Sequence, residues 1–141
     1  MKKTLVLVFA AALLFAVTAF AEPVKFPNGL TIDVAPGWSY EGEGEGITLI
    51  AEDESCVIFI SVSDAEGASS KDVAEAMSRE HGGSKPQQID EDIYLYTFNN
   101  EHGADCRVFT GVDNGKIKIV LIAGDHKDVE DMINSIEELF N

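Results

Sequence analysis

The feature that most constrains this chain is a pair of apolar runs separated by a tight-turn sequence. Runs 104–112 and 116–123 are rich in β-branched and aromatic residues, and Asp113-Asn114-Gly115 stands between them. Asn-Gly tolerates the positive φ angles that a type I′ hairpin turn requires. The two runs are therefore predicted to be antiparallel neighbours in a sheet.

Further apolar runs predict more strands. Run 56–63 is apolar at both parities, with Cys56 and Ile58 on one face and Val57 and Phe59 on the other. Successive side chains of a strand point to opposite faces, so this strand is predicted to be covered on both sides. Run 116–123 is also apolar at both parities, so its strand is likewise predicted to be covered on both sides. The other predicted strands span residues 30–34, 47–51 and 93–99.

Two helices are predicted from their end signals and apolar spacing. Ser69 is a suitable N-cap, Asp72 lies in the first turn, and Gly82 ends the first helix. A final helix follows Asp125, with its apolar face formed by Val129, Met132, Ile133, Ile136, Leu139 and Phe140. Antiparallel strands with helices packed on them predict an α+β fold, arranged as an α/β/α sandwich.

Residues 1–21 have the pattern of a secretory signal peptide. Lys2 and Lys3 precede an uncharged run that closes with Ala19-Phe20-Ala21. Cleavage there leaves residues 22–141, which we expect to form a single domain in the periplasm or the extracellular medium. The alternative is an uncleaved anchor, because the run is near the lower length limit for crossing a bilayer.

The charge balance excludes some classes of partner. The chain has 10 Lys and Arg against 25 Asp and Glu, and its formal net charge is −15. Such a surface repels nucleic acid phosphates and anionic lipid headgroups, so we expect no nucleic acid binding. We also expect no membrane insertion of residues 22–141. Basic or neutral proteins, peptides and cations are the favoured partners.

The two cysteines, Cys56 and Cys106, suggest a disulfide, because export leads to an oxidising compartment. Closing a loop of about 50 residues would destabilise the unfolded state by roughly 4 kcal/mol. The alternative is two separate buried thiols, since cysteine is often buried when unbonded.

No catalytic arrangement is evident in the sequence. The histidines are His81, His102 and His126, and none stands in a pattern that pairs a nucleophile with a base. A Gly-x-Ser-x-Gly nucleophile elbow is also missing from the sequence. We therefore expect no enzyme and no cofactor, and a hydrolase is the last of the alternatives.

Aromatic side chains are the candidate binding residues. Trp38 and Tyr40 share a parity, and Tyr94 and Tyr96 line one face of a predicted strand. Aromatic rings supply large contact area with few rotamers, so they could receive a hydrophobic peptide or a small ligand. The alternative is that these rings fill the core beneath a helix.

The stretch YEGEGEGI places Glu41, Glu43 and Glu45 at alternate positions with glycine between them. Period two would point the carboxylates to one side of a strand, where they could bind calcium. Alternating glycine weakens a strand, and the spacing of a dedicated calcium loop is missing. The stretch is therefore interpreted as an acidic loop or frayed strand edge that opposes aggregation.

The order of elements resembles that of a known fold. The segments FPNGLTIDVAPGW, GASSKDVAEAM and DVEDMINSIEEL, with strands between them, resemble the Mog/PsbP-like fold, and in particular its small exported bacterial members of unassigned function. The resemblance implies an α/β/α sandwich used as a binding or accessory module. The resemblance assigns no functional residue in this sequence.

The expected function is that of a non-catalytic exported accessory or binding module with a protein or peptide partner. The alternative is a small-molecule or calcium-binding envelope protein.

Overall fold

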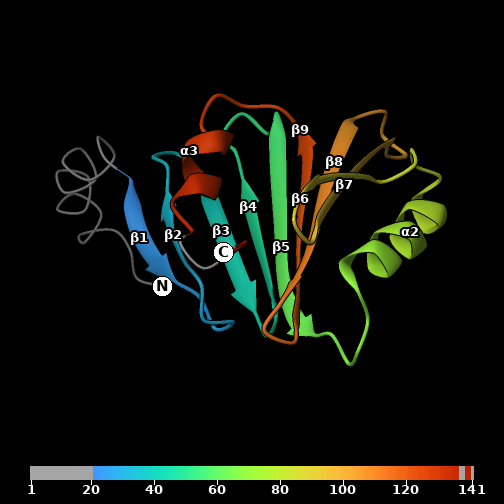
Figure 1. The fold of residues 1–141 in the computed structure, drawn as a ribbon. Coiled ribbons are helices and arrows are strands. Elements are labelled where there is room, and N and C mark those ends of the chain that lie inside the picture. The colour runs from blue at the N-terminus through green and yellow to red at the C-terminus, as the bar shows by residue number, and fades with distance from the viewer. Residues whose placement is uncertain (1–20, 137–138, 141) are drawn as a thin grey trace, which may run out of the picture.

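The computed structural model of the chain describes residues 21–136 and 139–140. Residues 1–20, which hold nearly all of the predicted signal peptide, lie outside the described residues. The described chain forms one seven-stranded antiparallel sheet of order β3-β4-β5-β9-β8-β7-β6 and a two-stranded ribbon, β1-β2 (Figure 1). The strands are β1 Glu22–Lys25, β2 Thr31–Val34, β3 Ser39–Glu43, β4 Gly46–Ile50, β5 Cys56–Asp64, β6 Gln87–Asp90, β7 Ile93–Asn99, β8 Asp105–Asp113 and β9 Lys116–Gly124.

The hairpin prediction is confirmed. Strands β8 and β9 are antiparallel neighbours, and Asp113 pairs with Lys116 across the turn. Asn114 and Gly115 have φ angles of 51° and 76°, which is the positive range that this turn requires. Local sequence therefore determines this pairing.

The first helix prediction is also confirmed. Helix α2 spans Ser70–His81, and the Ser69 side chain accepts a hydrogen bond from the Asp72 amide at 3.1 Å. Gly82 ends the helix in the left-handed conformation, with φ 67°. Both caps satisfy backbone groups that the helix ends would otherwise leave unpaired.

The predicted α/β/α sandwich is wrong, because the structure is dominated by strands. The final helix, α3, covers only Val129–Asn134, and Ser135 is its C-cap. The N-terminal residues instead form the ribbon β1-β2, which takes part of the covering role that a second helical layer would have. Residues 137–138 of the predicted helix lie outside the described residues.

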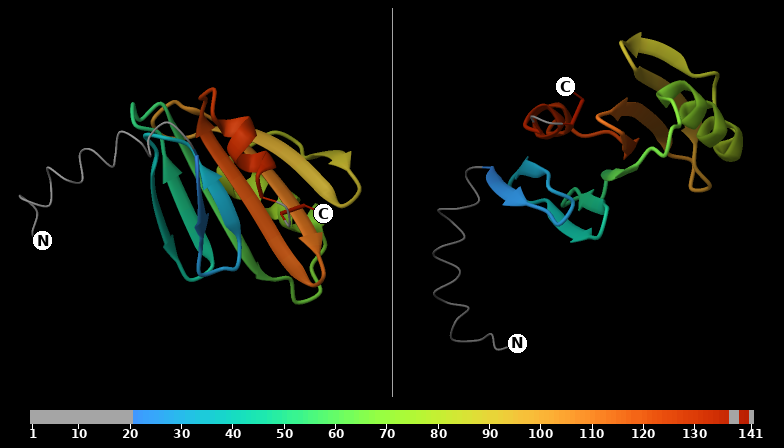
Figure 2. Two further views of the ribbon diagram at one scale, coloured as in Figure 1. Left: turned by 90° about the vertical axis from the view of Figure 1, so that its left-hand side faces the viewer. Right: turned by 60° about the horizontal axis from the view of Figure 1, so that its bottom comes forward.

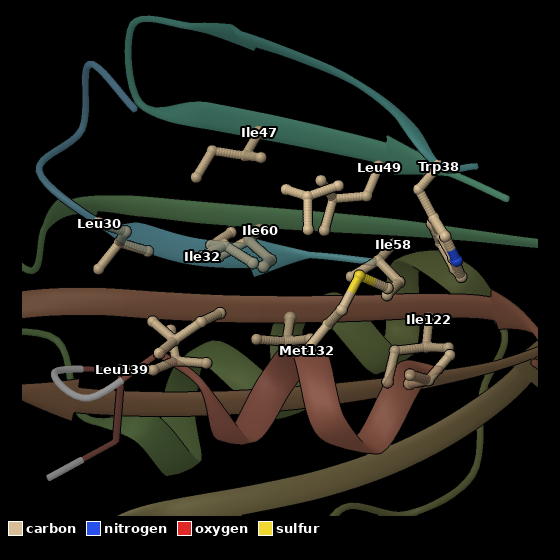
Figure 3. Close-up of a cluster of buried hydrophobic side chains, with 14 of the residues drawn as sticks. Leu30, Ile32, Trp38, Ile47, Leu49, Ile58, Ile60, Ile122, Met132 and Leu139 are labelled. Carbon is tan, nitrogen blue, oxygen red and sulfur yellow. The ribbon is translucent and has the colours of Figure 1, made fainter. Parts of the chain in front are cut away.

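The two faces of the large sheet are covered differently. We call the face under the ribbon and α3 the inner face; it holds most of the core (Figure 3). Leu49 and Ile58 pair across β4 and β5 on this face, and Met132 of α3 packs among them. Helix α2 lies on the opposite side of the sheet, the outer face (Figure 2).

Cover of the outer face is incomplete. Helix α2 makes its main sheet contacts with β7 and β8. Ala74 and Ser78 of the helix and Tyr96 and Val108 of those strands are buried there. On the outer face of β5, by contrast, Phe59 is 40% exposed, so the prediction that β5 is covered on both sides is wrong.

Candidate functional site

The uncovered part of the outer face is rich in apolar side chains, with Thr48, Ser61 and Ser63 among them. Cross-strand pairing places Phe59 of β5 beside Leu121 of β9, and Ile50 of β4 beside Val57. Phe59 is exposed and its neighbours are half-buried. We call this surface the outer patch and define it by Ile50, Val57, Phe59, Ile117, Ile119 and Leu121.

An acidic border runs along one side of the outer patch. Glu41 and Glu43 pair with Thr48 and Gly46 of β4, so their side chains point to the outer face of the edge strand β3. With Glu45 they line a hollow of about 460 Å³ whose other lining includes Phe59. The sheet therefore holds carboxylates at one margin of an exposed aromatic ring.

Glycine has a specific structural role in YEGEGEGI. A Cβ on Gly42 would lie 2.6 Å from Cδ1 of Phe26, because the ribbon packs closely on the inner face at this point. Gly44 has φ +59° in the turn between β3 and β4. The stretch is therefore an edge strand and a tight turn, with glycine toward the ribbon at Gly42 and carboxylates toward the outer face.

Helix α2 forms the other margin of the outer patch. Lys71 and Glu75 form an ion pair at 3.2 Å on one flank of the helix, within electrostatic reach of Tyr94 on β7. With 3.6 residues per turn, Val73 and Met77 lie on the opposite flank of the helix. Because β9 lies on the far side of β8 from β7, we infer that this flank faces β9. Both are half-buried, so the helix presents an apolar flank to the outer patch.

Trp38 and Tyr40, the first pair of predicted binding aromatics, lie on the ribbon side of the sheet. Trp38 is 7% exposed, and its Nε1 donates to Oδ2 of Asp128 at 3.1 Å. Its ring meets His126 edge-on, with 5.1 Å between centroids. Tyr40 is 49% exposed and packs edge-on against Phe26. Trp38 therefore links the loop before α3 to the start of β3 through this hydrogen bond and ring contact.

Tyr94 and Tyr96, the second pair, lie on the outer face beneath α2. Tyr96 is fully buried, and its hydroxyl is 2.7 Å from Nδ1 of His81. Burial raises the pKa of Tyr96 to about 12. Tyr94 is half-buried. The four aromatics thus occupy opposite faces of the sheet and do not form one binding wall.

The predicted disulfide is not formed. Cys56 and Cys106 are both buried and unbonded, on β5 and β8, which flank β9. Two strand spacings separate them by about 9–10 Å, which exceeds the reach of a disulfide. Cys56 pairs with Gly124 whereas Cys106 pairs with the adjacent Ala123, so the two thiols point to opposite faces.

We expect protein isolated from an oxidising compartment to contain two free thiols. Both are 1% exposed, and burial raises the pKa of Cys56 to about 11, so neither should react with a thiol reagent at neutral pH. Titration before and after unfolding in urea, with intact mass under non-reducing conditions, measures this. A mass lower by two hydrogens would show that the disulfide is formed and would contradict this prediction.

The described residues provide no metal centre. Among residues 21–136 and 139–140, no group of three or more His, Cys, Asp and Glu side chains is arranged to hold a metal ion. The carboxylates on β3 point to one face but do not converge on a point.

We therefore expect the melting temperature to be equal in millimolar calcium and in chelator. A ligand that binds only the folded state must raise the melting temperature, so a rise with calcium would contradict this prediction. Differential scanning calorimetry at constant ionic strength measures the effect, with magnesium as the matched control.

A second hollow lies on the inner face between α3 and β8. It measures about 330 Å³ and has an apolar floor that includes Phe109, Ile122 and Ile133. Arg107 stands at its margin, 41% exposed and 3.9 Å from a carboxylate oxygen of Asp125. That carboxylate is itself 90% exposed, so water screens the pair and the guanidinium can bind another anion.

Comparison of the sequence with protein-family models finds no match, and comparison with curated proteins finds no significant similarity. In the part of the chain that the structure describes, every helix is too short or too polar to cross a lipid bilayer. The site must therefore be interpreted from its own geometry.

Sequence reasoning missed the outer patch, although part of its signal was visible. The alternation in β5 puts Val57 and Phe59 on one face, and that in β9 puts Ile119 and Leu121 on one face. Apolar residues at both parities of a strand indicate burial on both faces only where other elements cover both faces of the sheet. The available helix covers β7 and β8 instead, and no local signal specifies that placement.

Proposed function

We propose that this chain is an exported, non-catalytic module that binds an apolar segment of a partner protein through the outer patch. The observation that carries the proposal is a group of half-buried apolar side chains on one sheet face around Phe59, which is 40% exposed. Contiguous exposed apolar surface with a polar rim is characteristic of interaction sites. Aromatic anchors contribute strongly to such interfaces.

The acidic border supports a partner with basic residues. Glu41, Glu43 and Glu45 lie beside the apolar floor, and the whole chain carries a net charge of −15. Complementary charge at a rim accelerates encounter and sets orientation, whereas apolar contact supplies most of the affinity. Association should consequently slow as salt is added.

The test is capture of a partner from the envelope fraction by residues 22–141 and by two variants. Phe59→Ser should weaken binding at least tenfold, because it removes an aromatic anchor worth about 2 kcal/mol. Ile89→Ser is the matched control, since Ile89 is 49% exposed on the far edge strand β6.

Titration calorimetry with the recovered partner gives the two affinities, and urea unfolding checks that both variants remain folded. Recovery of one stoichiometric partner that distinguishes the variants supports the proposal. Equal affinity of Phe59→Ser, Ile89→Ser and the unaltered domain would refute it.

The hollow beside α3 favours a second candidate function, binding of a small apolar molecule that carries a carboxylate. Arg107 would bind the head group while Phe109 and Ile133 contact the tail. Decanoate should then raise the melting temperature and decyltrimethylammonium should not. Arg107→Gln should abolish the shift, whereas Arg79→Gln, exposed on α2, should retain it. Equal shifts with both amphiphiles would exclude this function.

A further inference from the structure

We infer that the partner segment is a cationic amphipathic α-helix that lies alongside α2 and completes a helical layer on the outer face. The inference rests on the proposed function, because it specifies what occupies the outer patch. Three properties of the patch lead to it: its width, the nature of its two margins, and the position of its charge.

The width of the uncovered surface suits one helix. Strands β9, β5 and β4 lie between the strands that α2 covers and the edge strand β3. Strands are about 4.8 Å apart, so the open surface is roughly 15–20 Å across. A helix with its side chains is about 10–12 Å in diameter and packs about 8–10 Å from a neighbouring helix. A single helix beside α2 therefore fills the space without reaching beyond β3.

The margins match the two kinds of surface on an amphipathic helix. The floor offers Phe59 and Leu121, and the flank of α2 offers Val73 and Met77, so apolar contact is available from two directions. The apolar stripe of an amphipathic helix spans about 100° or more, which allows it to contact both floor and flank.

The charge is on the side away from α2. Glu41 and Glu43 are exposed on β3, and Glu45 is exposed in the turn that follows. Lysine or arginine beside the apolar stripe of the bound helix would face these carboxylates. An acidic helix in the same position would place like charges together and would be repelled.

Other occupants explain the patch less well. An added strand would pair with the backbone edge of β3 and leave Phe59 and Leu121 uncovered. A second copy of this chain would bring two surfaces of net charge −15 together, with their acidic borders close to each other. Strand addition remains a distinguishable outcome of the experiment.

The experiment uses three synthetic peptides of about 18 residues, long enough to form a helix on binding. The first has one leucine stripe flanked by lysine. The second has the same pattern with two central prolines, and the third replaces lysine with glutamate. Fluorescence anisotropy measures affinity for residues 22–141, and circular dichroism measures the helix content gained. We expect the first to bind at least tenfold more tightly than either other peptide, with a gain in helicity.

Two variants of α2 test the position of the helix. Met77→Lys should weaken the lysine peptide at least tenfold, because it places a cation on the flank that faces the outer patch. Ala76→Lys adds the same charge to an exposed position and should change the affinity less than twofold. Phe59→Ser should weaken binding as Met77→Lys does.

The outcomes separate this inference from the proposed function. Equal binding of the proline peptide, no gain in helicity, or indifference to Met77→Lys would overturn the bound helix, including in favour of strand addition at β3. The proposed function would survive such a result if Phe59→Ser still weakened capture of the envelope partner. Binding that responds to peptide charge but not to Phe59→Ser would show non-specific attraction and would also overturn the inference.

Discussion

Replacing Gly124 with alanine is expected to destabilise the protein by about 3 kcal/mol or more, because a positive φ and a backbone clash act together. Gly124 ends β9 at φ +85°, and an added Cβ would lie 2.2 Å from the carbonyl oxygen of Ser55. Neither backbone can withdraw without breaking the pairing of Gly124 with Cys56. The loop that follows carries His126 and Asp128 to Trp38, so its contacts should loosen as well.

The matched control is Gly67→Ala. Gly67 has φ +88°, nearly the same as Gly124, but nothing lies within 4 Å of the position of its Cβ. Only the backbone conformation is then penalised, at about 1–2 kcal/mol. Urea unfolding followed by circular dichroism measures both variants. Equal losses would mean that the close approach at Ser55 has no energetic consequence.

Replacing Leu49 with alanine is expected to cost about 2–5 kcal/mol, since it opens a cavity in the inner core. Leu49 is 0% exposed on β4 and lies among Ile58 and Met132 beneath the ribbon (Figure 3). The deleted methyl groups leave a space that the surrounding elements cannot fully close, because strand pairing holds the sheet and the ribbon in place. The midpoint of urea unfolding should fall while its slope stays unchanged.

Ile89→Ala is the control for the core variant. Ile89 is 49% exposed on β6, so truncation removes little buried surface and should change stability by less than about 0.5 kcal/mol. A loss at Leu49 no greater than that at Ile89 would contradict the assignment of the inner face as the main core. Neither substitution touches the outer patch, so any binding by folded protein should persist in both.

The predictions that held are those that depend on neighbouring residues. Asn114-Gly115 forms the β8–β9 turn, and Ser69 and Gly82 cap α2, because turn and cap preferences act within a few residues. These signals remain readable wherever the element lies in the molecule.

The disulfide and the α/β/α sandwich failed for a different reason. Two cysteines in a chain that is predicted to be exported are an argument from composition, whereas a disulfide requires the two thiols to be in contact. The intervening strand β9 and opposite side-chain directions prevent it here. The sandwich failed because the final helix is short and the ribbon β1-β2 shares the inner face with it.

In the candidate site, too, local features were predictable from the sequence and long-range placement was not. The carboxylates of YEGEGEGI could be identified as an acidic feature, and their common direction followed from period two. Their position beside Phe59, and the placement of α2 over β7 and β8, depend on strand order. Strand order is set by contacts between residues far apart in the chain, which no local pattern reports.

The turns, the caps and the strand periodicity followed from residues close together in the chain, and the acidic charge followed from composition. The tertiary structure alone decided which apolar face was left open. One 12-residue helix covers two strands of a seven-stranded sheet, and the ribbon and α3 cover the other side. The surface that remains uncovered is rich in apolar side chains, has an acidic border, and is the basis for the proposed function.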